Sequence, residues 1–226
     1  DDPERQMRRS IAFARVSLDK TDADIHYSPR PAGKRLRIGY FSADFHTHAT
    51  VFLLAGMLRE HDPEQVEVTA YSYGVHKAEA VTSQLARHVD RFVDMRGVPT
   101  PDFVDRVRAD DLDIAIDLKG FPREARLDMF ARRIAPIQMT HLGYPGTLGS
   151  TSFDYFVADP VTIPDAYRHC YTEKILYMPA CYQPNDNQRP IAETTTTRAD
   201  FGLPEDAFVF CSFNANYKIE PRCFGA

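Results

Sequence analysis

Short apolar runs alternate with stretches of helical periodicity over most of this chain. The runs are rich in Ile, Val, Tyr and Phe, which favour strands, and the stretches that separate them are long enough for helices. Strands are predicted at 37–42, 66–73, 91–95, 112–118, 137–142, 153–159 and 173–179, and helices at 51–60, 78–88, 102–109 and 124–131. Strands joined by helical crossovers predict a parallel sheet covered on both faces, and hence an α/β, Rossmann-like domain.

The two ends of the chain depart from this alternation. Pro3–Leu18 places apolar residues at helical spacing, which predicts an amphipathic helix, and the proline-containing segment 28–34 reads as a linker. A polar stretch without a pattern begins at Pro184, and an apolar run at 207–213 follows it. We therefore expect a helix and linker at 1–31, a Rossmann-like domain at 32–184, a linker at 185–206, and the first strand and loop of a truncated second domain at 207–226.

Composition narrows the class of protein. The chain has 226 residues, 43% of them hydrophobic, which is enough for a sizeable core, and its net charge of −5 argues against nucleic-acid and membrane-surface binding. It contains neither an apolar run long enough to span a membrane nor a secretory signal. Its four cysteines lack CxxC spacing and read as reduced thiols. We therefore expect a cytoplasmic protein with small-molecule or protein partners.

A loop rich in glycine and proline follows the strand predicted at 137–142. It contains Gly143, Tyr144, Pro145, Gly146 and Thr147. Glycines allow close approaches that a Cβ would block, and the proline stiffens the turn between them. The loop either binds a ligand against its backbone or is a tight turn that only reverses the chain.

Titratable residues follow two of the predicted strands. Asp44, His46 and His48 come after the strand at 37–42, where a parallel sheet presents catalytic groups, and histidine is suited to proton exchange at neutral pH. His48 could instead be a surface histidine or cap a helix, and a metal site at these three residues lacks a second cluster of ligands.

A second group, Asp113, Asp117 and Lys119, surrounds the strand predicted at 112–118. Asp117 could serve a site, or it could cap a helix by accepting hydrogen bonds from backbone N–H groups at the helix start. Lys218, near the end of the chain, precedes a predicted helix and is suited to binding a diphosphate, although it could also be a solvated lysine.

Taken in order, the segments RIGY–SADF–H, APIQ–LGYPGT–G, DY–D and FN–YKI–P resemble the catalytic region of the O-GlcNAc transferase family, from Leu36 to Pro221. The resemblance implies inverting, metal-independent transfer of N-acetylglucosamine from UDP-N-acetylglucosamine (UDP-GlcNAc) to serine or threonine hydroxyls of proteins, with no other cofactor. It also implies the N-terminal half of a GT-B enzyme, whose second half mainly holds the nucleotide-sugar. The helix at 3–18 would end a tetratricopeptide-type region.

The resemblance assigns roles to particular residues. His48 matches the histidine of the family's DFxxH motif, a candidate general base, and Lys218 matches the lysine that neutralises the departing UDP diphosphate. Residues 143–147 match the loop beside the donor sugar, and with Asp44 and Asp117 they form the expected substrate-binding set.

Three positions depart from the family's pattern. Phe121 and Pro122 replace a histidine and a threonine of many bacterial members, and Ala215 replaces a uridine-diphosphate-contacting glutamine of the animal enzymes. The donor could therefore be UDP-glucose or GDP-fucose instead. Plant relatives that resemble the family transfer fucose. A non-catalytic half-enzyme that acts as a binding module is the alternative from a different class.

Overall fold

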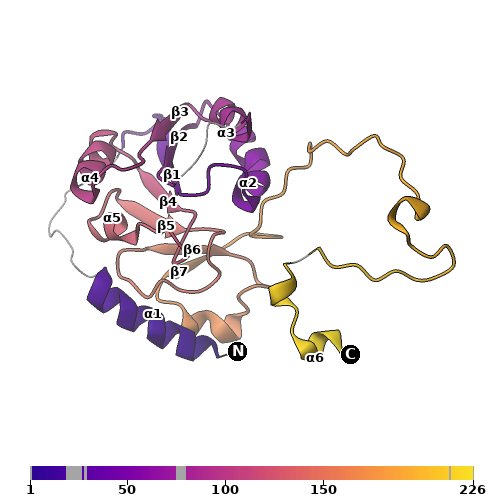
Figure 1. Cartoon of the computed structure of the whole chain (residues 1–226). Coiled ribbons are helices and arrows are strands. Elements are labelled where there is room, and N and C mark those ends of the chain that lie inside the picture. Colours follow the sequence, from indigo (N-terminus) through magenta and orange to yellow (C-terminus); the bar gives the residue numbers. More distant parts are fainter. Residues whose placement is uncertain (1, 19–26, 28–29, 75–79, 214, 226) are drawn as a thin grey trace. The chain divides into compact units, whose positions relative to one another are not determined.

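The computed structural model describes residues 2–18, 27, 30–74, 80–213 and 215–225. These residues form two compact units, which we call unit 1 (Asp1–Gln188) and unit 2 (Arg189–Ala226). Each unit is described by itself. Unit 1 contains the sheet and its covering helices (Figure 1).

Unit 1 is built on a seven-stranded sheet in the order β3-β2-β1-β4-β5-β6-β7. Every neighbouring pair of strands is parallel. The strands are β1 (Leu36–Ser42), β2 (Val66–Ser72), β3 (Arg91–Asp94), β4 (Ile114–Asp117), β5 (Ile137–Thr140), β6 (Tyr155–Ala158) and β7 (Lys174–Tyr177). The order reverses direction between β1 and β4, which is where doubly wound folds place their ligands.

Helices cover both faces of the sheet, with α2 and α3 on one face and α1, α4 and α5 on the other (Figure 1). Neighbouring residues of a strand point to opposite faces of the sheet and so pack into different hydrophobic cores. In β1, Tyr40 packs into the core on the α2 side and Phe41 into the core on the α4 side. The helices are α1 (Pro3–Ser17), α2 (Ala49–Arg59), α3 (Ala80–Leu85), α4 (Thr100–Ala109) and α5 (Leu127–Ala131), with 3-10 turns η1 (Ala86–His88) and η2 (Asp165–Cys170).

The predicted Rossmann-like parallel sheet is confirmed, and the differences lie at the ends of elements. The helix predicted from 124 begins at Leu127, because Glu124 has a φ of 69° and cannot be part of a right-handed helix. The strand predicted to reach 142 stops at Thr140, since Leu142 has a φ of 70°. Residues 78 and 79 of the predicted second helix lie outside the described residues.

The N-terminal helix α1 belongs to the same compact unit as the sheet. Ala14 is buried in the core on the α4 side, and the ring of Phe13 meets the ring of Phe121 edge-on at 5.3 Å. This packing supports the predicted amphipathic helix. The boundary between residues 31 and 32, and the origin of α1 in a tetratricopeptide-type region, stay predictions.

Unit 2 does not form the strand predicted at 207–213, and no residue described in unit 2 is in a strand. Phe208, Phe210 and Phe213 are 81%, 90% and 97% exposed. A strand requires a neighbouring strand to satisfy its backbone groups, and the described residues of unit 2 provide none. The unit contains two 3-10 turns, η3 (Ala199–Phe201) and η4 (Asn216–Lys218), and the short helix α6 (Pro221–Phe224).

Within the described ranges, no helix combines the length and the apolar character that crossing a membrane would require.

Candidate functional site

The loops that follow β1 and β4 bring Asp44 and Lys119 together. Phe41 of β1 pairs with Asp117 of β4, so the residues just beyond these strands meet at one edge of the sheet. The ammonium of Lys119 lies 2.7 and 2.8 Å from the two carboxylate oxygens of Asp44, and both side chains are buried. The sequence singled out both residues but did not pair them, because their pairing depends on the strand order.

Two histidines flank this ion pair. His48 Nδ1 lies 3.8 Å from one carboxylate oxygen of Asp44, and His46 Nε2 lies 3.9 Å from the other. The ring centroids of His46 and His48 are 5.6 Å apart. Asp44, Lys119, His46 and His48 therefore form one polar cluster at the carboxyl edge of the sheet.

His48 also caps α2. The backbone N–H of Thr50 donates to His48 Nδ1 at 3.2 Å, and the Thr50 hydroxyl lies 3.0 Å from the same atom. Because Nδ1 accepts a hydrogen bond, the neutral ring carries its proton on Nε2. In this arrangement Nε2 can donate a hydrogen bond, and the ring can take up a proton only at Nδ1, once Nδ1 releases Thr50.

Asp117 shapes the loop after β4. Its carboxylate is fully buried and accepts hydrogen bonds from the backbone N–H groups of Lys119 at 3.1 Å and Gly120 at 2.7 Å, and from the Thr140 hydroxyl at 3.4 Å. Burial raises the pKa of Asp117 to about 6, although these hydrogen bonds oppose the shift. These backbone donors belong to the loop after β4, whereas the next helix begins only at Leu127, so Asp117 holds a loop and does not cap a helix as the alternative supposed. Asp113 lies at the other end of β4 and accepts a hydrogen bond from Arg37 N.

The loop at 143–147 is packed tightly against the loop after β4. A Cβ on Gly143 would lie 2.1 Å from the carbonyl oxygen of Leu118, so no other residue fits there without a backbone shift. The ring of Tyr144 packs edge-on against Phe121 at 5.2 Å. Phe121 thus supports Tyr144 from the loop after β4.

The far end of this loop is anchored to the segment before β7. The hydroxyl of Thr147 donates to Glu173 Oε2 at 2.6 Å, and Leu148 N donates to Glu173 Oε1 at 2.8 Å. The Tyr171 hydroxyl donates to the carbonyl of Pro145 at 2.8 Å. The Thr147 hydroxyl is therefore held by contacts within the fold, and Tyr144, Pro145 and Gly146 line a cavity.

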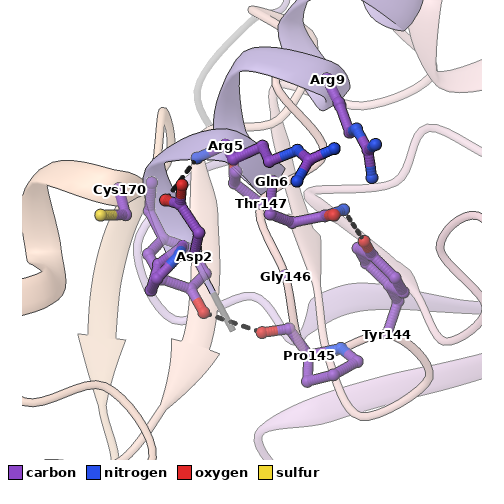
Figure 2. A pocket seen from close by; sticks show the side chains of 11 residues that line it. Asp2, Arg5, Gln6, Arg9, Tyr144, Pro145, Gly146, Thr147 and Cys170 are labelled. Carbon is purple, nitrogen blue, oxygen red and sulfur yellow. Dashed lines mark hydrogen bonds between the residues drawn. The ribbon is translucent and has the colours of Figure 1, made fainter.

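That cavity has a volume of about 660 Å³ and lies between the first turns of α1 and the loop at 143–147 (Figure 2). Gln6 of α1 donates a hydrogen bond to the Tyr144 hydroxyl and ties the helix to the loop. Arg5 and Arg9 extend from the same part of α1. The apolar spacing of α1 predicts only a packing helix; the i, i+4 spacing of these two arginines is the sequence signal for a charged site on it.

The sequence was compared with models of known protein families. The sequence model of glycosyl transferase family 41 matches residues 6–191 and 183–226. The chain belongs to this family. The resemblance seen in the sequence motifs is thereby confirmed.

This family-41 chain is 35% identical over 194 residues to the Arabidopsis thaliana protein named "Probable UDP-N-acetylglucosamine--peptide N-acetylglucosaminyltransferase SEC", covering 84% of the chain and 20% of that protein. It is 37% identical over 164 residues to the "UDP-N-acetylglucosamine--peptide N-acetylglucosaminyltransferase" of Caenorhabditis elegans, covering 72% of the chain and 14% of that protein. The chain thus spans about a fifth or less of these relatives.

A solved structure resembles the fold as well. A mutant of the Thermobaculum terrenum O-GlcNAc transferase superposes with a TM-score of 0.76 at 31% identity, over 81% of this chain and 35% of that one. The Rossmann-like fold of the family-41 chain therefore has a counterpart in an O-GlcNAc transferase.

The predicted residue Lys218 lies in unit 2, and its role stays a prediction. Its backbone is part of η4, but its side chain is outside what the structure describes, as is all of Asn214. Among the described residues of the family-41 chain, no group of three or more His, Cys, Asp or Glu could hold a metal ion. At the Asp44 cluster, both carboxylate oxygens are already engaged by Lys119.

Proposed function

We propose that this chain belongs to the catalytic region of a protein glycosyltransferase that moves N-acetylglucosamine from UDP-GlcNAc to serine or threonine hydroxyls. The observation that carries the proposal is the family-41 match over both units, together with relatives named for this activity. The geometry is compatible with it, since the His48 cluster follows β1 at the reversal of the sheet and the loop at 143–147 follows β5, the neighbour of β4.

The proposed reaction inverts the anomeric centre and uses no metal. The acceptor oxygen attacks the anomeric carbon as the bond from that carbon to the diphosphate oxygen breaks, the electron pair leaves with UDP, and the acceptor proton goes to a base. Lys218 would stabilise the growing charge on the diphosphate. His48 would contact the acceptor hydroxyl. It would accept the proton at Nδ1 once the hydrogen bond from Thr50 to this atom is broken.

The loop at 143–147 would hold the sugar mainly through its backbone. Gly143, Tyr144, Pro145 and Gly146 are proposed to border the donor sugar, whereas Thr147 and Asp117 would act by shaping the loops. Asp44 would hold its place beside His48 through its ion pair with Lys119. We also infer a cytoplasmic protein whose partners are a nucleotide-sugar and a protein acceptor; the net charge of −5 argues against nucleic acid.

The test is calorimetric binding of UDP and GDP to the full-length protein, its Lys218→Ala variant and a Lys174→Ala control on the exposed β7 edge. We expect UDP to bind in preference to GDP, and we expect Lys218→Ala to weaken UDP at least tenfold, a loss of about 1.4 kcal/mol. The control should bind as the unmodified protein does. A preference for GDP would favour the fucose donor, and a folded protein that binds neither nucleotide would favour the non-catalytic alternative.

A further inference from the structure

The cavity beside α1 contains two positive charges without a counterion. Arg5 and Arg9 lie one helical turn apart, and neither guanidinium has a hydrogen-bond or ion-pair partner among the described residues. Like charges at this spacing destabilise a helix by a few tenths of a kcal/mol. Local features that cost stability in this way are expected mainly where a ligand compensates them.

The nearby carboxylates are engaged elsewhere. Asp2 caps α1 by accepting a hydrogen bond from Arg5 N at 2.9 Å, and it lies 4.0 Å from Arg8. Glu4 pairs with Arg8 at 3.4 Å. Glu173, behind the loop, is taken up by Thr147 and Leu148. Among the described residues that line the cavity, the charge left without a partner is therefore positive.

We propose that this cavity binds an aspartate or glutamate side chain of the protein acceptor, close to the serine or threonine that receives the sugar. The inference rests on the proposed function and adds the class of acceptor to it. Arginine guanidinium groups bind carboxylates through paired, charge-assisted hydrogen bonds. A cavity of about 660 Å³ has room for such a side chain and for the adjoining peptide.

The position of the cavity favours the acceptor over the donor diphosphate. Its wall is formed by Tyr144, Pro145 and Gly146, the loop assigned to the sugar, and Gln6 binds Tyr144 from the same helix that carries both arginines (Figure 2). The diphosphate charge already has a candidate partner in Lys218. An anion at Arg5 and Arg9 would thus come from the second substrate.

The experiment measures sugar transfer by the full-length protein to a series of neutral peptides with one serine, in which a single glutamate or its isostere glutamine is placed at each position within about four residues of that serine. We expect glutamate at one or more positions to lower KM at least fivefold relative to glutamine, with little change in kcat. Arg5→Gln and Arg9→Gln should remove this preference. Arg15→Gln, in the last turn of the same helix and outside the cavity lining, is the matched control and should retain it.

Two further readouts separate the explanations. The affinity for UDP should be unchanged in the Arg5→Gln and Arg9→Gln variants. If these variants lose as much UDP affinity as they lose transfer activity, the cavity belongs to the donor and the proposal is overturned. Equal KM values for glutamate and glutamine peptides would also overturn it. If no peptide is glycosylated, the proposed function fails, and peptide binding by fluorescence anisotropy then decides: binding of glutamate peptides that Arg9→Gln weakens supports the acidic site, and its absence refutes it.

Discussion

At the scale of single residues, Asp117 combines full burial with a structural task. The carboxylate accepts two backbone N–H groups of the loop that leads to Lys119 and Gly120, and its surroundings still raise its pKa to about 6. Since this folded-state value is above the unfolded value of 3.8, the folded protein holds the proton more tightly. Ionisation of Asp117 therefore opposes folding.

This imbalance predicts a pH dependence of stability. The contribution of Asp117 is most favourable below pH 4 and is lost as the pH rises towards 6, by up to about 3 kcal/mol. Urea unfolding of the protein and of Asp117→Asn between pH 4 and 7 isolates this contribution, because all other groups titrate in both. We expect the unfolding free energy of Asp117→Asn to increase relative to that of the unmodified protein as the pH rises. A constant difference would contradict the raised pKa.

His48 has two tasks that substitutions can separate. Asparagine is a good N-cap, so His48→Asn should keep the stability of α2, whereas His48→Ala should lose about 0.5–2 kcal/mol. Both variants should lose transfer activity by about 100-fold or more if the ring meets the acceptor. Unfolding and transfer rates are measured on the same preparations. Full activity in His48→Asn would reduce the role of His48 to that of a cap.

At the scale of elements, the strands were predictable because β-branched and aromatic runs are punctuated by helical stretches. The ends of α5 and β5 were not, since they are set by the left-handed backbone of Glu124 and Leu142, which neither residue type indicates. The ion pair between Asp44 and Lys119 requires β1 and β4 to be neighbours, a fact that the order of elements along the chain does not contain. The arginine-lined cavity likewise depends on where α1 packs.

The contact between the loops after β4 and β5 gives a prediction at this scale. Gly143→Ala places a methyl group against a backbone carbonyl that cannot change rotamer, and we expect a loss of about 3 kcal/mol in unfolding free energy. Gly97→Ala is the control: Gly97 has a φ of 66° but nothing within 4 Å of its Cβ position, so its cost is the conformational one of about 1 kcal/mol. If both variants lose the same unfolding free energy in urea, the backbone around Gly143 can move to accept a methyl group, and the prediction is wrong.

At the scale of the whole molecule, all strands and both large cores lie in unit 1. We therefore expect residues 1–188 to unfold at the same urea concentration as the 226-residue chain. Ending at residue 180 should lower that midpoint, because it removes Asp186, which pairs with Arg59 at 2.9 Å, and Tyr182, whose carbonyl lies 2.8 Å from His141. A lower midpoint for 1–188 itself would mean that unit 2 stabilises the sheet.

The central place of β1 has a consequence for synthesis. Ile38 pairs with Ile114, so one side of β1 stays open until a strand encoded more than 70 residues later leaves the ribosome. At translation rates of about 5–20 residues per second, this delay is on the order of 4–15 s. For that time the nascent chain exposes an apolar strand edge that can pair with other chains. The strand that organises the finished sheet is thus the one that most needs protection while the protein is being made.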